Sequence, residues 1–389
     1  MLVTIRKLYF ANFFMGLIFW YGIEKLFMQS IGINATQIGL VIASALGVTL
    51  LLDIPAGIVA DRWSRKGVLA LSLVAMILCC LILGNASGFI SYLIGYSISG
   101  GLFVVGTSGT AASIVYDTLH EHDASNLYSK IMGRTYAFYL AGIAVANIVS
   151  GFLAQLLNFR ATYFLTILSC VIAIAIVLTI KEPPFHKKEQ KERVLSQLGS
   201  VTKTMMKSKM IFILAMILSA LTVVQVFKND FGQLYILRYV SEPQFIGLLW
   251  AGGALSWAAG NLIAHHFKTR LTSLMIVTVL PLIAMSFIDT WFSLVLFMVQ
   301  QIAMGALFNQ IETRVQDVTP SVVRTSILSV LSSLGRAIAV PTSIFIGWII
   351  SRYDVFLALR FVSIIALVAL FYWLWHRFAR HVKDEPLES

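Results

Sequence analysis

Residues 57–66 read GIVADRWSRK and separate two apolar runs, 36–60 and 67–85. Each run has about 20 residues, which is the length that an α-helix needs to cross a lipid bilayer. Gly57 permits close contact between helices, Asp61 marks the end of the first run, and three cations follow in the turn. The stretch therefore predicts two membrane-spanning helices joined by a short basic turn.

The composition of the whole chain agrees with a lipid environment. Of its 389 residues, 58% are hydrophobic and only 12% are charged, and the mean hydropathy is +0.85. A soluble domain carries about 25% charged residues, because its surface must be hydrated. So little polar surface cannot cover a protein of this size in water. Most of the chain is therefore expected to lie in lipid.

The formal net charge of +11 does not indicate nucleic-acid binding, because Lys and Arg occur in short segments between apolar runs. The three cysteines, Cys79, Cys80 and Cys170, lie inside apolar runs without metal-ligand spacing, which is typical of packing residues. The polar clusters His120–Asp123 and His265–His266 are expected to be hydrated loops. We therefore expect no metal, no cofactor and no enzymatic site.

Twelve apolar runs predict an all-α integral membrane protein built as two six-helix bundles related by a pseudo-two-fold repeat. The runs are 8–28, 36–60, 67–85, 89–117, 129–157, 161–181, 210–230, 244–266, 271–288, 291–317, 322–350 and 355–377. The predicted parts are a first bundle over 1–181, a linker over 182–209, a second bundle over 210–378 and a tail over 379–389.

Basic residues in the connections predict the orientation, because Lys and Arg concentrate on the cytoplasmic side of a membrane. Twenty of them lie in one alternating set of connections, and the other set holds three, which are Arg160, Arg238 and Arg352. Both termini and the linker are therefore expected in the cytoplasm, with the chain in the cell (inner) membrane. Within the linker, apolar residues three to four apart suggest either an amphipathic surface helix or a solvated connector.

Sequence landmarks recur in the two halves with an offset of about 200 residues. Gln37–Leu40 opens the second run and Phe245–Leu248 opens the eighth. The pair Gly133-Arg134 has a counterpart in Gly335-Arg336. A duplicated six-helix unit is characteristic of secondary transporters, in which two bundles move around a central site.

The basic turn resembles the signature loop of the major facilitator superfamily, which reads G-x-x-x-D-R/K-x-G-R-R/K. Ser64 stands where that family prefers glycine, and the corresponding loop of the second half, 264–270, has lost its acidic residue. The matching residues are Gly57, Asp61, Arg62, Arg65 and Lys66. The resemblance extends over essentially the whole chain, and it implies the family's fold and solute transport by alternating access.

The solute and its direction are less specified than the fold. No G-x-x-x-x-G-K-[ST] motif occurs, so an ion gradient is the expected energy source. Proton-coupled export of amphipathic or drug-like compounds is the leading hypothesis, although the fifth run lacks the G-x-x-x-G-P-x-x-G motif of many drug exporters. The alternatives are an importer or facilitator of a nutrient, metabolite or lipid and, more remotely, a membrane sensor or enzyme. A monomer is expected.

Charged residues inside spanning helices are functional candidates, because lipid does not solvate them. Toward the outside, Glu24 and Lys25 in the first run correspond to Lys228 and Asp230 in the seventh, at an offset near 204 residues. Pairs Glu24–Lys228 or Lys25–Asp230 would close an outer gate. The other interpretation is a static pair or a lysine that reaches the interface.

A second group of charges lies near the predicted cytoplasmic ends. By the resemblance, these residues form an inner gate, and the alternative is ordinary interfacial charge. Besides the residues of the turn, they are Asp117, Arg134, Glu312, Arg314, Asp317 and Arg336.

Three carboxylates are candidates for proton coupling, in the order Asp53, Glu24 and Glu312. Asp53 precedes Asp61 by eight residues, which places it about 12 Å deeper in the membrane. A desolvated carboxyl at that depth suits a proton carrier. The competing interpretation is a hydrogen bond from Asp53 to a neighbouring helix, with a bend of the helix at Pro55.

Uncharged polar and aromatic residues within the runs are candidates for the wall of a substrate cavity. Trp250 and Trp257 are further candidates for apolar or cation-binding walls. The predicted cavity residues are Asn12, Trp20, Tyr21, Gln225, Gln233, Asn309 and Gln310.

Overall fold

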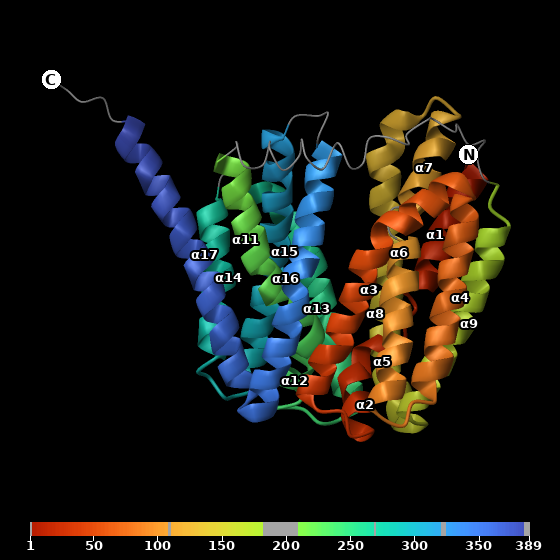
Figure 1. The fold of residues 1–389 in the computed structure, drawn as a ribbon, viewed down its shortest axis with the longest axis horizontal. Coiled ribbons are helices and arrows are strands. Elements are labelled where there is room, and N and C mark those ends of the chain that lie inside the picture. The colour runs from red at the N-terminus through yellow and green to blue at the C-terminus, as the bar shows by residue number, and fades with distance from the viewer. Residues whose placement is uncertain (1, 108–109, 182–208, 268–269, 320–323, 385–389) are drawn as a thin grey trace. The chain divides into compact units, whose positions relative to one another are not determined.

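The computed structural model describes residues 2–107, 110–181, 209–267, 270–319 and 324–384. All regular elements in these ranges are helices (Figure 1). The predicted all-α fold is therefore confirmed for the described part of the chain. The predicted linker, with its amphipathic helix, lies outside it apart from Lys209.

The first half contains six long helical stretches, two of which are interrupted (Figure 1). The first consists of α1, the 3-10 turn η1 and α2, and the fourth of α5, the π-helical segment η2, α6 and α7. In chain order the bounds are α1 Leu2–Gly16, η1 Tyr21–Ile23, α2 Glu24–Ser30, α3 Ala35–Arg62, α4 Arg65–Gly84, α5 Phe89–Ile98, η2 Ser99–Val104, α6 Val105–Thr107, α7 Thr110–His120, η3 Ser125–Leu127, α8 Tyr128–Leu156 and α9 Phe159–Leu178.

The second half repeats this order of long helices. Its first stretch is also interrupted, by the π-helical segment η4. The last helix continues to Asp384 and so includes part of the predicted tail. The bounds are α11 Lys209–Val226, η4 Phe227–Phe231, α12 Gly232–Ile236, α13 Pro243–Ile263, η5 Ala264–Phe267, α14 Leu271–Met285, α15 Phe292–Val318, α16 Arg324–Arg352 and α17 Val355–Asp384.

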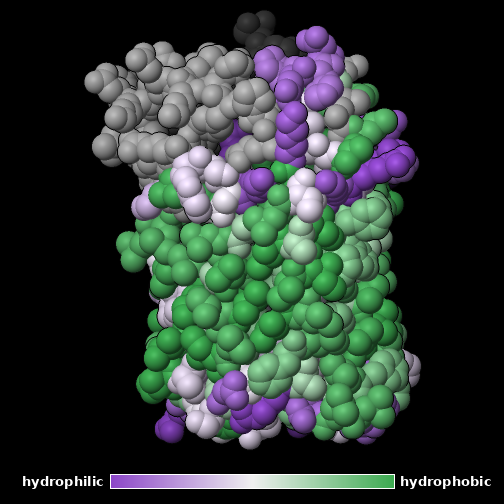
Figure 2. All heavy atoms as spheres, turned by 90° about the vertical axis from the view of Figure 1, so that its right-hand side faces the viewer, coloured by the Kyte–Doolittle hydropathy of each residue, from purple (hydrophilic) through white to green (hydrophobic). Residues whose placement is uncertain are grey.

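Eleven of the described helical stretches are long and apolar enough to cross a membrane, and the twelfth, α14, is apolar but shorter. The 15 residues of α14 extend about 22 Å, less than the roughly 30 Å of a hydrocarbon core. Figure 2 shows a continuous hydrophobic belt on one face of the molecule, with hydrophilic residues at its two ends. The chain is thus a multi-pass membrane protein, as its composition predicts.

The chain divides into two compact units. Unit 1 comprises 1–189 and 236–251, and unit 2 comprises 190–235 and 252–389. The break near residue 189 falls within the predicted linker. Unit 1 also takes in the connection before α13 and the first residues of that helix.

Local sequence explains several helix starts. Asn34 and Gln37 form a capping box at α3, in which each side chain accepts a hydrogen bond of 3.0 Å from the other residue's backbone N–H. At α4, the Ser64 hydroxyl accepts a 2.9 Å bond from the Gly67 N–H. Ser64, where the family loop prefers glycine, therefore serves as an N-cap.

Helices α1 and α8 are in close contact at Gly16, the residue at which α1 ends. A Cβ on Gly16 would lie 2.2 Å from the Tyr139 carbonyl oxygen, and one on Gly142 would lie 2.2 Å from the Phe13 carbonyl oxygen. Only glycine permits this approach of two backbones. Immediately after Gly16, α1 ends and the chain turns through 17–23 before α2 begins at Glu24.

Candidate functional site

The interruption of the first spanning stretch places two opposite charges inside unit 1. Glu24 and Lys25 begin α2, and the side chain of each is only 1% exposed. The Lys25 Nζ lies 2.7 Å from the Glu24 Oε2, so the two neighbours form an ion pair. Removing one partner of a buried pair costs about 3–5 kcal/mol, because the other charge loses its compensation.

Aromatic residues surround this pair. The Tyr92 hydroxyl donates a 3.2 Å hydrogen bond to the Glu24 Oε1, and it lies 2.9 Å from the Tyr163 hydroxyl. The Trp20 ring stacks on Tyr163 with a centroid separation of 5.4 Å. Both carboxylate oxygens of Glu24 thus have hydrogen-bonded partners while the side chain is excluded from solvent.

A buried amide lies beside the same interruption. The Asn147 side chain is 1% exposed, and neither its Nδ2 nor its Oδ1 has a hydrogen-bond partner among the described residues. A Cβ on Gly22 would lie 3.1 Å from this Oδ1. Unsatisfied buried amides are uncommon and point to a functional constraint or a bound polar group.

The corresponding region of unit 2 carries a cation of a different kind. Lys228 lies in η4, is partly exposed, and places its Nζ 4.3 Å from the centroid of the Trp257 ring. Among the described residues, Lys228 contacts no carboxylate. A desolvated cation–π contact contributes about 2 kcal/mol. π-helical segments inside α-helices are frequent at functional sites.

Two amides, one on α13 and one on α15, lie next to Trp257 and to each other. The Asn261 Nδ2 donates to the Trp257 carbonyl at 3.0 Å, and the Asn309 Nδ2 approaches the Asn261 Oδ1 at 3.5 Å. The Phe308 ring lies 6.0 Å from the Trp257 ring. The two helices approach closely at Gly305, where a Cβ would lie 2.4 Å from the Trp257 carbonyl oxygen.

Three of the residues predicted for an inner gate make polar contacts in unit 1. Arg65 forms an ion pair with Asp117 and also donates to the Ser113 carbonyl at 3.3 Å. Lys66 donates to the Ile180 carbonyl at 3.1 Å, beyond the C-terminus of α9. The side chains of three other motif residues lie outside the described part of the structure; these are Gly57, Asp61 and Arg62.

The remaining inner-gate candidates differ in exposure. The Arg314 guanidinium lies 5.9 Å from the Trp373 ring centroid in unit 2. Arg336 is partly buried. The exposed candidates are Arg134, Glu312 and Asp317.

The predicted cavity residues fall into two groups. Asn12 and Gln310 are buried and donate to backbone carbonyls of their own unit, to Leu8 at 2.9 Å and Ala264 at 2.7 Å. Gln233 is also buried, whereas Gln225 and Asn309 are partly exposed. The Tyr21 ring, also partly exposed, contacts the Trp250 ring edge-on at 6.2 Å.

The first candidate for proton coupling, Asp53, is partly exposed within α3. The helix contains Pro55 and continues through it to Arg62. Asp53 is therefore less enclosed than Glu24, the second candidate.

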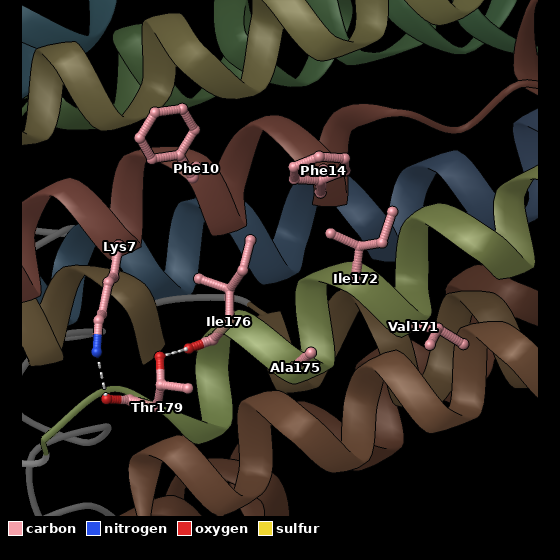
Figure 3. Close-up of a pocket in the computed structure, with 8 residues that line it drawn as sticks. All are labelled: Lys7, Phe10, Phe14, Val171, Ile172, Ala175, Ile176 and Thr179. Carbon is pink, nitrogen blue, oxygen red and sulfur yellow. Dashed lines mark hydrogen bonds between the residues drawn. The ribbon is translucent and has the colours of Figure 1, made fainter.

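A groove between α1 and α9 was not predicted from the sequence. It has a volume of about 570 Å³, and Figure 3 shows apolar side chains along it with Lys7 at one end. The Lys7 Nζ donates to the Thr179 carbonyl at 2.8 Å, and the Thr179 hydroxyl donates to the Ile176 carbonyl at 2.7 Å. Its lining is mostly apolar, and its two polar residues, Lys7 and Thr179, donate to backbone carbonyls.

Several of these residues were missed because they are uncharged. Tyr92, Tyr163, Asn147 and Asn261 are polar residues within apolar runs, and that was the available signal. Their importance depends on which helices pack together, and spacing along one helix does not show it. Among the described residues, no group of three His, Cys, Asp or Glu side chains is arranged to hold a metal ion.

A family model described as Major Facilitator Superfamily matches residues 8–340. Among proteins of curated function, none matches the chain in sequence.

Three solved structures illustrate the likeness of the fold. A mutant of the nucleoside transporter NupG has a TM-score of 0.81 at 16% identity, over 95% of this chain and 99% of its own. A bacterial homolog of the human lysosomal transporter Spinster has a TM-score of 0.76 at 14% identity, over 97% and 96%. A D-xylose–proton symporter has a TM-score of 0.71 at 13% identity, over 95% of each chain.

Proposed function

Since the chain belongs to the major facilitator superfamily, we propose that it couples solute transport to a proton carried by Glu24. The family and the fold establish a transporter of small solutes, and they favour this over an enzyme. The proton, the carboxylate that takes it up and the direction of transport are the proposal. The buried Glu24–Lys25 pair carries it.

Enclosure distinguishes Glu24 from the other two carboxylates. Its side chain is 1% exposed, whereas Asp53 is partly exposed and Glu312 is exposed. A change of charge in a dry environment has a far larger energetic effect than the same change in water. Protonation of Glu24 is therefore the event most able to alter the relative stability of two conformations.

The pair supplies a physical link between protonation and conformation. With Glu24 ionised, its charge compensates Lys25, and the neutral pair tolerates burial. Once Glu24 is protonated, Lys25 loses the counter-charge that lies 2.7 Å from its Nζ. A conformation that hydrates Lys25 is then favoured, so proton uptake shifts the equilibrium between two states of the transporter.

Accessibility tests this link without knowledge of the solute. The native cysteines are replaced, and a single cysteine is introduced at the partly exposed Gln225. Its rate of reaction with a membrane-impermeant maleimide is then measured against pH. Because the thiolate is the reacting form, each rate is divided by that of a free thiol at the same pH. We expect this ratio to depend on pH in the parent protein and to become pH-independent in Glu24→Gln.

Asp53→Asn is the matched control, because it removes a second carboxylate of the first half and leaves the pair intact. It should preserve the pH dependence. Loss of the dependence in Asp53→Asn, with retention in Glu24→Gln, would transfer the coupling role to Asp53.

The sequence predicts export of an amphipathic compound, with uptake as the alternative. The solved structures named above are nucleoside, sugar and Spinster-type transporters, and at their low identity they support the fold alone. A pH gradient of known sign across proteoliposomes separates the directions. Export requires solute to move against the proton flux, and uptake requires solute to move with it.

The orientation completes the proposal. We propose that both termini lie in the cytoplasm and that the chain lies in the inner membrane of the cell. The reason is that Lys and Arg concentrate in one alternating set of connections. Protease protection of tags at the two ends, in vesicles of known sidedness, tests this placement.

A further inference from the structure

We infer that the face formed by Lys228, Trp257, Asn261 and Asn309 binds the anionic group of an amphipathic organic solute. These four residues all belong to unit 2 and are all partly exposed. The inference rests on the proposed function only in identifying that solute as the transported one. Binding itself is measurable without transport.

The first support is an uncompensated cation. Lys228 lies within the apolar stretch Met210–Ile236, and among the described residues its contact is the Trp257 ring. Asp230 is close in sequence, but no ion pair joins it to Lys228. Ionisable groups in spanning helices mark substrate and ion pathways by default. The lysine residue as a whole is partly exposed.

The second support is the group of side chains around Trp257, the residue whose ring the ammonium contacts. Trp257 and Phe308 offer adjacent ring surfaces, with centroids 6.0 Å apart. Asn261 and Asn309 add amide groups within reach of one another, at 3.5 Å. A carboxylate can pair with the Lys228 Nζ while an apolar body lies against the rings. Inorganic anions would leave those rings unused.

The third support is the contrast with the charges of unit 1. Lys25 is paired with Glu24, and Arg65 is paired with Asp117. These pairs are neutral as units and do not require an external anion. At Lys228 the described surroundings supply a ring and no counter-charge. The Lys228 ammonium would repel an organic cation there. The Trp257 ring therefore makes its cation–π contact with Lys228 and not with a solute.

Thermal stability of the purified protein tests the inference with three probes of one skeleton. Phenylpropionate is anionic, phenylpropanol is neutral and phenylpropylamine is cationic at neutral pH. We expect phenylpropionate alone to raise the melting temperature in a saturable manner. Lys228→Gln should weaken its apparent affinity at least tenfold, and Lys228→Arg should retain most of it.

Arg360→Gln is the matched control. Arg360 also belongs to unit 2 and lies over an aromatic ring, with its guanidinium 4.9 Å from the Phe287 centroid. Its removal eliminates a cation–π contact away from the proposed face. It should alter the melting temperature of the unliganded protein without changing the preference for phenylpropionate.

Each outcome is informative. Equal stabilisation by the neutral alcohol, undiminished affinity in Lys228→Gln, or no stabilisation by the anion overturns the inference. Binding of phenylpropionate without any transport under a pH gradient sustains the inference and contradicts the proposed function. If the pH-dependent conformational change persists but phenylpropionate does not bind, the proposed function is sustained and this inference is overturned.

Discussion

The first spanning stretches of the two halves are interrupted at corresponding places, and they treat charge in opposite ways. In unit 1 the turn through 17–23 precedes Glu24 and Lys25, which neutralise one another at 2.7 Å. In unit 2 the π-helical η4 carries Lys228 against a tryptophan ring. At the predicted offset of 204 residues, a lysine stands where the first half has its glutamate.

Because of this difference in charge, we expect the two interrupted stretches to have different functions although both are breaks in a spanning helix. A neutral, enclosed pair responds to the gain of a proton, because protonation unbalances it. A partly exposed lysine that contacts no described carboxylate can pair with an anion. We therefore propose a division in which unit 1 senses protons and unit 2 holds the solute. The duplicated frame sets both positions within the membrane, and single residues at those positions set the chemistry.

The largest effect that this comparison predicts is on the charge moved per cycle. If one monoanion leaves for each proton that enters, the cycle moves the equivalent of two positive charges inward. A membrane potential of 100 mV then contributes about 4.6 kcal/mol to the driving force for transport. Cotransport of the two is electroneutral. With export as the predicted direction, a potassium-diffusion potential should strongly drive phenylpropionate transport in proteoliposomes. Transport that ignores the potential would establish uptake together with the proton.

The next largest effect is on stability, from breaking the pair in unit 1. Lys25→Met should destabilise the protein by about 3 kcal/mol, because it leaves a buried carboxylate uncompensated. The double variant Glu24→Gln with Lys25→Met should recover most of that loss. Lys228→Gln should cost only about 1–2 kcal/mol, since it removes a cation–π contact. Denaturant unfolding in micelles measures all three, and similar losses for Lys25→Met and Lys228→Gln would remove the distinction between the halves.

A smaller effect is expected from the hydroxyl that supports Glu24. Tyr92→Phe removes the 3.2 Å hydrogen bond to the carboxylate together with the 2.9 Å hydrogen bond between the Tyr92 and Tyr163 hydroxyls. The bond to the carboxylate should account for about 1.5–3 kcal/mol, the range for bonds to charged groups. Tyr96→Phe is the control, because its ring faces the Lys25 ammonium at 5.8 Å and the ring is kept. Equal losses in the two variants would show that the Tyr92 hydroxyl does not act through Glu24.

The smallest effect concerns the turns that follow the second helix of each half. Ser64 caps α4 with its hydroxyl, whereas Arg270 at the start of α14 makes no side-chain cap. Ser64→Ala should cost about 1 kcal/mol, and Ser64→Gly, which restores the residue that the family loop prefers, only a few tenths. Thermal unfolding distinguishes them. A larger loss in Ser64→Gly than in Ser64→Ala would contradict a capping role.

The outer gate across the two halves stays a prediction. In this structure Glu24 forms an ion pair with Lys25 and accepts a hydrogen bond from Tyr92, both within unit 1. If Glu24 pairs with Lys228 when the gate closes, reversing both charges should restore activity that either single reversal abolishes. Absence of rescue, with both single variants present in the membrane, would favour the static pair.

The sequence analysis predicted more of the fold than of the site. Each of the twelve apolar runs contains helix in its described residues, and the pairing of Arg65 with Asp117 joins two residues of the predicted inner gate. Among the proton-coupling candidates it ranked Asp53 above Glu24, because depth was judged from distance along one helix. Asn12 and Gln310, predicted for the cavity, are hydrogen-bonded to backbone within their own units, and their place in a cavity stays a prediction.

The amino-acid sequence by itself determined that lipid surrounds this chain and that it crosses the membrane as helices. Lipid offers no hydrogen bonds to the backbone, so apolar runs of sufficient length must satisfy their own, and composition alone requires this. Only the tertiary structure decided which charges are enclosed and by what. Tyr92 reaches Glu24 from α5, and Trp257 reaches Lys228 from α13. Their arrangement depends on glycine contacts and on helix interruptions that spacing does not reveal.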